Sequence, residues 1–356
     1  MERIERLREK FKENEMDGML ITSAYNRRYM TRFTGSAGVV VISKKGAKFI
    51  TDFRYVDQAG EQAKGYEVVQ HTASIIDEVA KAVSELGIKK LGFEQDHLTY
   101  SVFKLYEDKI DATLVPVSGV IEKLRMIKDS SELQTLKEAT EIADAAFEHI
   151  LTYIRPGLKE IDVSNELEFF MRKNGATSSS FDIIVASGVR SALPHGVASD
   201  KIIEKNELVT LDFGAYYKGY CSDITRTVAV GGDPGDELRN IYNIVLDSQL
   251  KALEQIKPGM TGKDADTVSR DIIADKGFGD YFGHSLGHGI GLEVHEGPGL
   301  SFRSDVVLEP GMVVTVEPGI YLSGKGGVRI EDDTVITESG NEKLSHTTKE
   351  LLIIGE

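Results

Sequence analysis

The chain has 356 residues, of which 41% are hydrophobic and 28% are charged, and its formal net charge is −15. This length predicts two domains, and the negative charge argues against nucleic acid or an anionic membrane as the main partner. No apolar run approaches the roughly 18 residues of a membrane helix, and no secretory signal is recognisable. Because Cys221 is the single cysteine, an internal disulfide is excluded and we expect a reducing, cytoplasmic setting.

The first 125 residues alternate between helical and strand patterns. In chain order these are a helix over 2–16, a hairpin over 38–53 with its turn at "KKG", a helix over 74–87 that ends at a glycine, and strands over 89–94 and 113–118. The alternation predicts an α/β domain over residues 1–125. A long amphipathic helix follows within residues 122–154, with Ser130 or Ser131 as its cap, so we place the domain boundary near residue 125.

The remaining sequence, residues 126–356, repeats itself. Residues 154–176 align without gaps on residues 256–278, with identical Ile, Pro, Gly, Asp and late Gly positions. Each copy predicts a helix end, a Pro-Gly turn, an aspartate cap (Asp162 or Asp264) and a second helix. Coincidence is the alternative, since Pro-Gly is common after helices, but the shared capping favours duplication. We therefore expect two related halves with a site between them.

Two acidic residues face each other in a predicted hairpin. "ELVTLDFGAYYKGYCSDITRTVAV", residues 207–230, has two β-branched runs around a turn. A four-residue loop over 216–219 sets Asp212 directly opposite Asp223, with Cβ atoms roughly 4.5–5.5 Å apart. Like charges repel at that distance, and aspartate is a poor strand former, so something must compensate.

A second hairpin repeats the arrangement in residues 313–336. Glu317 and Glu331 are symmetric about Gly324, so an odd-numbered loop pairs them. Pro318 removes one ladder bond and predicts an edge or a bulge. Asp332 and Asp333 are adjacent alternatives, but Glu331 is favoured by the symmetry and by sharing a strand face with Arg329.

These four carboxylates predict a site for two divalent ions. Scattered surface acids are the alternative, since the chain has 57 acidic residues. Two facing pairs in related halves, together with a histidine cluster, favour two ions about 3.5–4 Å apart. Oxygen-rich ligands suit manganese, with cobalt, iron or zinc as alternatives.

The histidine cluster lies in "GHSLGHGIGLEVHEGPGL", residues 283–300. A dinuclear site of this kind needs one or two imidazoles beside its carboxylates, and a proton-bearing group near the developing oxyanion. The candidates are His284, His288 and His295, together with His195 in "LPHG". The other histidines, His71, His97, His149 and His346, are expected at the surface or in packing.

Four stretches of the second half occur together in a known family. They are "LDFGAYYKGYCSDITRT", "GHGIGLEVHE", "TVEPGIY" and "VRIEDD", and the chain resembles the Xaa-Pro aminopeptidase and Xaa-Pro dipeptidase (prolidase) metallopeptidases. The first domain matches through "NRRYMTRFTGS" and "DFRY". The resemblance implies an α+β fold of two domains. Residues 1–125 form an α/β creatinase-like N-terminal domain, and residues 126–356 form a pseudo-twofold duplicated "pita-bread" catalytic domain.

The resemblance also implies roles for the candidates. Asp212 binds one metal, Asp223 and Glu331 bridge, and His288 with Glu317 holds the other. A metal-bridging hydroxide then attacks the scissile carbonyl, and Glu317 carries its proton to the leaving nitrogen. His295 stabilises the oxyanion, so the implied catalytic residues are Glu317, His295 and His195. The implied substrate-binding residues are His195, His284, His295 and Arg329. Cys221 is expected to be a buried apolar side chain and not a ligand.

The same residues distinguish this function from others found on related scaffolds. A methionine-type aminopeptidase shares the ligands but typically lacks a first domain of this kind, and creatinase lacks the ligands. A non-enzymatic peptide-binding protein usually loses ligands, and none is lost here. The expected partners are short proline-containing peptides, and the resemblance implies a homodimer.

Substrate length is predicted from one position. Xaa-Pro dipeptidases of the family often carry an arginine shortly after the "VHE" stretch, where it binds the substrate carboxylate. Gly299 stands about there in this chain, with Arg303 and Arg329 as possible substitutes. We therefore expect substrates longer than dipeptides to be accepted.

Overall fold

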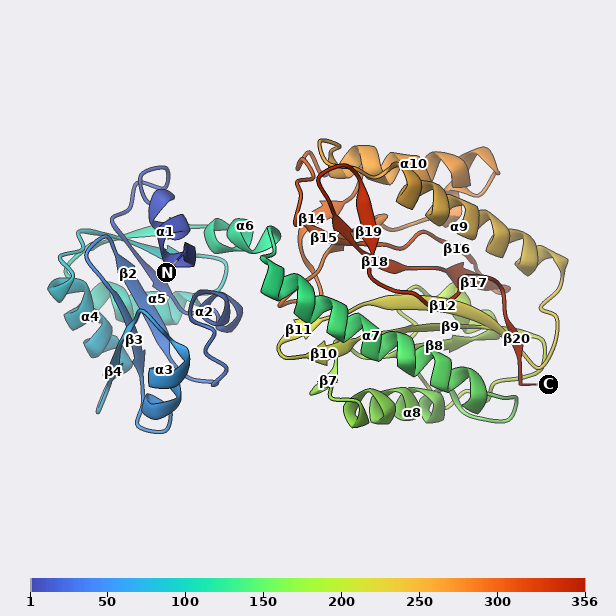
Figure 1. Cartoon of the computed structure of the whole chain (residues 1–356), viewed down its shortest axis with the longest axis horizontal. Helices are drawn as coiled ribbons and strands as arrows, with labels where there is room; N and C mark the ends of the chain where they lie inside the picture. The colour runs from blue at the N-terminus through green and yellow to red at the C-terminus, as the bar shows by residue number, and fades with distance from the viewer. Residues whose placement is uncertain (1, 356) are drawn as a thin grey trace. The chain divides into compact units, whose positions relative to one another are not determined.

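The computed structural model describes residues 2–355, which form two compact units, one extending to Arg125 and one beginning at Met126 (Figure 1). Within the described residues, no helix combines the length and the apolar character needed to cross a membrane.

The first unit is built around one mixed sheet. Its strands are β1 (Gly18–Ile21), β2 (Val39–Ser43), β3 (Ala47–Thr51), β4 (Glu67–Gln70), β5 (Lys90–Glu94) and β6 (Thr113–Val117). They lie in the order β4-β3-β2-β1-β5-β6, with β1–β2 and β2–β3 antiparallel and the other pairs parallel. The helices of this part are α1 (Glu2–Glu9), α2 (Ala24–Thr31), α3 (Val56–Gln62), α4 (Ile75–Glu85), α5 (Tyr100–Lys109) and α6 (Val120–Met126).

Most predicted elements of this unit are confirmed. The predicted hairpin is β2–β3, closed by a hydrogen bond from Ser43 N to Gly46 O at 2.8 Å, and both later strands are present as β5 and β6. The helix predicted over 2–16 is wrong beyond Glu9. Beyond Glu9 the chain forms turns in place of an α-helix. Lys10 N donates three residues back to Leu7 O, and the side-chain amide of Asn14 donates to the Lys10 carbonyl.

The second unit has two halves with the same order of elements. In each half two helices are followed by strands. The first half comprises α7 (Ser130–Tyr153), α8 (Glu160–Lys173), β7 (Ser178–Ser179), β8 (Ile184–Ser187), a 3₁₀ turn (Gly188–Ala192), β9 (Glu207–Phe213), β10 (Ala215–Tyr217), β11 (Tyr220–Cys221) and β12 (Ile224–Val230). The second half comprises α9 (Asp236–Gln255), α10 (Gly262–Asp275), a 3₁₀ turn (Gly279–Tyr281), β13 (Gly287–Gly289), β14 (Glu296–Leu300), β15 (Val313–Val316), β16 (Gly319–Leu322), β17 (Gly326–Arg329), β18 (Asp332–Ile336) and β19 (Asn341–Lys343), before β20 (Ile353–Ile354).

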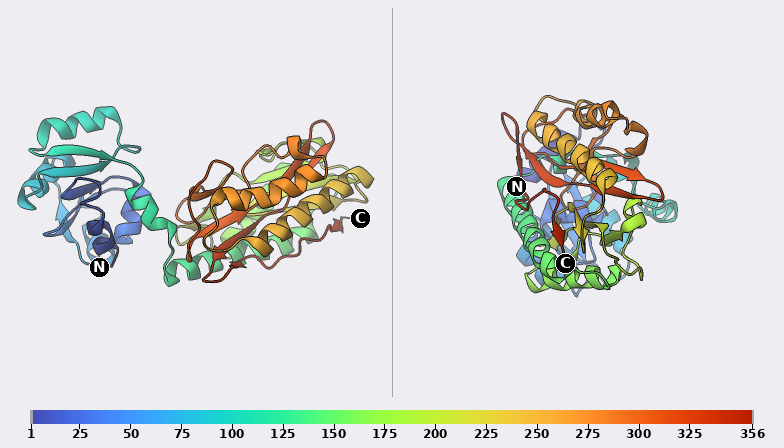
Figure 2. Two further views of the ribbon diagram at one scale, coloured as in Figure 1. Left: turned by 90° about the horizontal axis from the view of Figure 1, so that it is seen from above. Right: turned by 90° about the vertical axis from the view of Figure 1, so that its right-hand side faces the viewer.

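The strands of the second unit lie between two pairs of helices. Figures 1 and 2 show α7 and α8 on one side and α9 and α10 on the other. The larger sheets have the orders β20-β12-β9-β8 and β14-β13-β15-β18-β19. An isolated β-bridge between Thr225 and Glu331 links the first half to the second. The last strand, β20, returns to the first half and pairs with β12.

The helix caps of this unit differ from those predicted. Asp129, not Ser130 or Ser131, caps α7, and its carboxylate accepts from Ser131 N and Glu132 N. The caps of α8 and α10 are Lys159 and Thr261. Asp162 and Asp264 instead lie one turn inside each helix, where each carboxylate accepts the cap residue's backbone N–H. The two copies still share the same chemistry at the same place.

The register predicted for the first hairpin is wrong by two residues. Tyr217 pairs with Tyr220 around a two-residue turn, Lys218-Gly219, and Asp212 pairs with Thr225. Gly219 has φ +85°, which suits a tight turn of this kind. Because side chains alternate with a period of two, Asp223 stays on the face of Asp212 and becomes its diagonal neighbour.

The second hairpin has the predicted register. Val316 pairs with Asp332 and Gly319 with Arg329, which is the alignment that sets Glu317 opposite Glu331. The loop has three residues, between Leu322 and Gly326. The ladder is interrupted at Pro318, as its missing N–H predicts, so that β15–β18 and β16–β17 belong to separate sheets.

Candidate metal centre and substrate cavity

A cavity of about 600 Å³ opens in the second unit. Its lining includes all nine side chains singled out from the sequence: His195, Asp212, Asp223, His284, His288, His295, Glu317, Arg329 and Glu331. The four other histidines and Cys221 are not in the lining. Both halves of the duplication therefore contribute to one hollow.

Three of these residues form a compact ligand group. Asp223, His288 and Glu331 each offer a nitrogen or oxygen atom within 4.8 Å of the others. His288 Nε2 lies 3.7 Å from Asp223 Oδ2 and 3.3 Å from Glu317 Oε1. Asp223 comes from the segment before β12, His288 from β13, and both glutamates from the interrupted hairpin.

The carboxylates of the cluster outnumber the protein cations that could neutralise them. Asp212 Oδ1 and Asp223 Oδ1 are buried and accept no hydrogen bond. Arg329 is the single Lys or Arg among the lining residues, against five carboxylates, which are Asp182, Asp212, Asp223, Glu317 and Glu331. A buried, unpaired carboxylate is costly, so a divalent cation is the partner that this geometry accommodates.

The pKa shifts of the metal-free carboxyl groups also indicate that the cluster needs a positive partner. Burial, followed by the charge of Glu331 and then of Asp212, raises the pKa of Asp223 well above its usual value. Burial and Glu317 do the same to the pKa of Glu331. Burial raises the pKa of Glu317 to about 8, although Arg329 opposes this shift. Without a cation, these carboxyl groups bind protons, which reduce the repulsion between them.

Arg329 organises the side of the cavity near Asp212. Its Nη2 donates to Asp212 Oδ2 at 2.5 Å, its Nη1 to the Tyr321 hydroxyl at 2.9 Å, and its Nε to Thr225 Oγ1 at 3.2 Å. The Tyr321 hydroxyl also lies 2.8 Å from His284 Nε2. Arg329 thus fixes Asp212 and, through Tyr321, the ring of His284.

The hydrogen bonds of His288 leave one nitrogen for a metal. Its Nδ1 lies 3.1 Å from the carbonyl oxygen of Gly289, which can only accept, so Nδ1 carries the proton and Nε2 offers its lone pair to the carboxylates. Burial lowers the pKa of His288, which keeps the imidazole neutral. A neutral imidazole with a directed Nε2 is the ligand form of histidine.

The other histidines surround the ligand group. His295 packs edge-on against His288, with ring centroids 4.3 Å apart, and its pKa is lowered by burial and by the neighbouring imidazoles. Burial also lowers the pKa of His284 to about 4, and Arg329 contributes. His195 follows Pro194 in the lining. His295 is therefore available as a neutral donor or acceptor to a bound substrate, whereas the ring nitrogens of His284 are engaged with the Ser285 carbonyl and the Tyr321 hydroxyl.

The glycines around His288 serve close backbone packing. A Cβ on Gly287 would collide with the carbonyl of Thr315, and one on Gly289 with the carbonyl of Gly297. Thr315 Oγ1 in turn accepts from His288 N at 3.1 Å. Neighbouring strands therefore approach β13 closely and hold His288 at the cavity wall.

The structure adds residues that the sequence reasoning missed. Thr225 Oγ1 donates to Glu331 Oε2 at 2.6 Å, and Tyr321 bridges His284 and Arg329. Thr225 stands two residues after Asp223, on the same strand face, and that spacing was the available signal. Asp333, beside the favoured Glu331, accepts from Asp223 N at 2.9 Å and does not line the cavity.

The position predicted to decide substrate length is open. Gly299 lines the cavity, and nothing lies within 4 Å of the place where its Cβ would be. Arg303 is exposed, stacks on Phe302 with its guanidinium carbon 4.9 Å from the ring centroid, and is not in the lining. Arg329 is engaged with Asp212 and Tyr321. No fixed cation stands free in the lining to bind a carboxylate.

The family model for metallopeptidase family M24 matches residues 134–338, more than half of the chain. The chain belongs to metallopeptidase family M24. Residues 3–127 match the creatinase/prolidase N-terminal domain, so this M24 metallopeptidase has the two-domain α+β fold that its motifs imply.

Relatives of this M24 metallopeptidase match it over nearly its whole length. "Uncharacterized peptidase YqhT" of Bacillus subtilis is 63% identical over 353 residues, 99% of this chain and 100% of its own. A solved structure described as Xaa-Pro dipeptidase from Bacillus anthracis is 68% identical, with a TM-score of 0.98 over 99% of both chains. Another, described as X-Pro aminopeptidase from Thermotoga maritima, is 42% identical, with a TM-score of 0.92 over 99% of this chain and 100% of its own.

Proposed function

We propose that the chain is a metal-dependent peptidase that hydrolyses the Xaa-Pro bond at the N-terminus of short peptides, with two divalent ions per subunit. The observation that carries the proposal is the group of buried carboxylates with unpaired oxygens beside the directed Nε2 of His288. The names of the relatives, Xaa-Pro dipeptidase and X-Pro aminopeptidase, supply the bond that is cleaved.

Five residues would hold the ions. Asp212 would bind one ion, His288 and Glu317 the other, and Asp223 and Glu331 both. The unpaired oxygens of Asp212 and Asp223 and the contacts of His288 with Asp223 and Glu317 support this division. Four carboxylates and one imidazole are mostly hard ligands, so we propose Mn²⁺, with Co²⁺, Fe²⁺ or Zn²⁺ as alternatives.

The chemistry divides between the ions and the chain. When bound, a pair of divalent ions lowers the pKa of a water molecule and polarises a carbonyl. Glu317 would take the proton of that water and transfer it to the proline nitrogen as the peptide bond breaks. His295, beside His288, donates a hydrogen bond to the oxyanion.

Substrate binding uses the rest of the lining. Phe181, Ile184, Val197 and Val294 supply an apolar wall against which a proline ring can pack. His195 lines the same cavity and would present a ring nitrogen to the peptide backbone. His284 would contact the substrate through its ring, because its two nitrogens are engaged with the Ser285 carbonyl and the Tyr321 hydroxyl, and Arg329 fixes Asp212 in the same lining.

We also propose that tripeptides and longer peptides are substrates. The open space at Gly299 and the position of Arg303 outside the lining support this, because a strict dipeptidase needs a fixed cation for the carboxylate that follows proline. The homodimeric state follows from the family resemblance, and the cytoplasmic location from the single cysteine.

A peptide panel tests the function. Purified protein supplied with Mn²⁺ is incubated with X-Pro, X-Pro-Y and X-Ala-Y, and release of the first amino acid is measured. We expect cleavage of both proline peptides, with kcat/KM for X-Pro-Y at least equal to that for X-Pro, and little cleavage of X-Ala-Y. Preferred cleavage of a Met-Ala-Y peptide would instead indicate a methionine-type aminopeptidase. Binding without cleavage would indicate a peptide-binding protein.

A further inference from the structure

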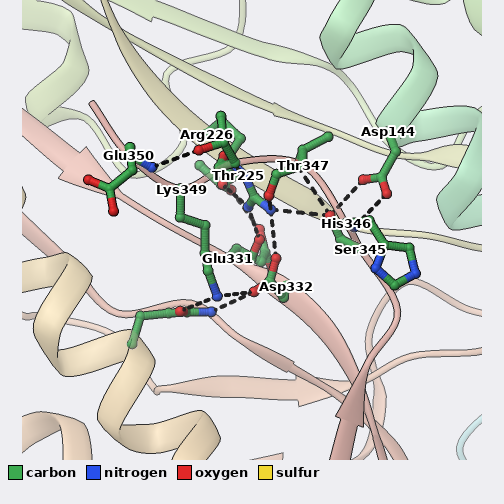
Figure 3. A network of polar contacts seen from close by, with 12 residues as sticks. Asp144, Thr225, Arg226, Glu331, Asp332, Ser345, His346, Thr347, Lys349 and Glu350 are labelled. Atoms are coloured by element: carbon green, nitrogen blue, oxygen red, sulfur yellow. Dashed lines mark hydrogen bonds and ion pairs between the residues drawn. The ribbon is translucent and has the colours of Figure 1, made fainter. Parts of the chain in front are cut away.

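Arg226 lies in β12, the strand that begins directly after the proposed ligand Asp223. It is 1% exposed and follows Thr225 in β12, so its side chain points away from the face that Asp223 and Thr225 present to the cavity. It is absent from the cavity lining. Figure 3 shows its guanidinium at the centre of a network of polar contacts.

The contacts of Arg226 reach the backbone of a proposed ligand. Its Nη1 donates to the carbonyl oxygen of Glu331 at 2.5 Å and to that of Thr225 at 2.9 Å. These two residues form the bridge that joins the halves, and their side chains also bond each other. Through these two hydrogen bonds, Arg226 holds the Thr225–Glu331 bridge from the side that faces away from the cavity.

The remaining donors of Arg226 hold the end of the chain. Nη2 donates to Asp332 Oδ1 at 2.7 Å and to Ser345 Oγ at 3.1 Å, and Nε donates to the carbonyl of Thr348 at 3.1 Å. A planar guanidinium can serve these directions together, whereas an ammonium group is a single point of charge.

The segment from Ser345 to Thr348, here called the C-terminal segment, is fixed at other points too. Ser345 Oγ and His346 N donate to the two carboxylate oxygens of Asp144 on α7, each at 2.6 Å. Lys349, the residue after the segment, donates from Nζ to Asp332 Oδ2 at 2.7 Å. The segment connects β19 of the second half with β20, which pairs with β12 of the first. It lies beyond the residues that the family model matches, which end at 338.

We propose that Arg226 is a positioning residue for the metal centre, and that it makes the C-terminal segment part of the support of Glu331. One buried guanidinium bonds both the Glu331 backbone and the segment. Outer contacts that orient a ligand commonly change metal affinity by about 10–100-fold when removed. The inference rests on the proposed metal site, and the experiment below separates the two.

Lys349 provides a matched control. It shares Asp332 with Arg226 and is also largely buried, but it makes no bond to Glu331 or Thr225. Arg226→Lys keeps the positive charge but loses the several N–H donors of the guanidinium, and Arg226→Gln loses both. Lys349→Met removes a neighbouring charge while leaving the hydrogen bonds of Arg226 to Thr225 and Glu331 intact. If only the charge balance around Asp332 matters, Arg226→Gln and Lys349→Met behave alike, and Arg226→Lys behaves like the unsubstituted protein.

The measurement is Mn²⁺ binding to metal-stripped protein by titration calorimetry, with circular dichroism and thermal unfolding to establish folding. We expect Arg226→Lys to lose about 10–100-fold in Mn²⁺ affinity and Lys349→Met to keep the affinity of the unsubstituted protein even where its Tm falls. Unchanged affinity in Arg226→Lys, or an equal loss in Lys349→Met, would overturn the proposal. An unsubstituted protein that bound no Mn²⁺ would instead refute the metal site itself.

Hydrogen exchange keeps the proposal testable if the Arg226 variants do not fold. In the unsubstituted protein, added Mn²⁺ should slow amide exchange in residues 344–350, although none of them lines the cavity. Residues 262–275 of α10 serve as the control. Exchange in residues 344–350 that is unaffected by Mn²⁺ would show that the segment is not coupled to the site.

Discussion

Metal binding to the stripped protein should release protons, and the number released should fall as the pH rises. The perturbation is the addition of Mn²⁺ to metal-free protein, whose carboxylates repel one another in a buried site. With a pKa of about 8, Glu317 carries about 0.9 proton at pH 7 and about 0.1 at pH 9. Asp223 and Glu331, with pKa values raised well above the usual range, add to the release at pH 7.

Titration calorimetry in buffers of different ionisation enthalpy counts these protons. We expect about one to three protons released per chain at pH 7, and roughly one fewer at pH 9 as Glu317 becomes ionised beforehand. Binding of Mn²⁺ with no proton release at pH 7 would refute the reasoning, because the carboxylates would then be charged without a cation. A release that did not change with pH would refute the role given to Glu317.

The same shifts set the stability of the metal-free protein. A carboxyl group whose pKa is raised in the folded state stabilises the fold fully below its unfolded pKa, and this contribution is lost as the pH rises through the folded pKa. For Glu317 the window runs from its usual value near 4.5 to about 8. Urea unfolding of stripped protein should therefore show falling stability across this window, and saturating Mn²⁺ should restore it.

Three further predictions concern single residues. Asp223→Asn should weaken both ions together, whereas retention of two ions and near-normal turnover, measured by metal analysis and peptide assay, would contradict its bridging role. His295→Ala should lower kcat by roughly 10²–10³-fold with metal content intact, and loss of metal would make His295 a ligand instead. Cys221→Ala should keep activity, and burial, which raises the pKa of Cys221 to about 12, should leave the thiol unreactive toward iodoacetamide at pH 8 until the protein is unfolded.

The sequence was sufficient for the elements that bring the acids together. Tight turns and β-branched runs placed both hairpins, and Gly324 as a centre of symmetry aligned Glu317 with Glu331 as the strands do. The first hairpin was misaligned because "YYKG" admits both a four-residue and a two-residue loop, and left-handed backbone at Lys218 and Gly219 closes the shorter one. Because the register differs by two residues, both aspartates stay on one face of the hairpin, and the predicted site is unaffected.

Other features could not be read from residue types. The interaction of Arg226 with Glu331, 105 residues later, depends on how the chain end crosses between the halves. Asp129 is followed by two serines, which are also capping residues, and only the backbone geometry shows which of the three precedes the first turn. The sequence around Tyr321 does not distinguish it from an ordinary strand residue, although its hydroxyl lies between His284 and Arg329.

The most direct test of the central claim is hydrolysis of X-Pro-Y by stripped protein as Mn²⁺ is added in measured equivalents. If the buried acids and His288 form a dinuclear peptidase centre, activity should be absent without metal and should reach its maximum near two ions per chain. Hydrolysis by fully stripped protein, or an inactive protein that holds two ions, would contradict the account.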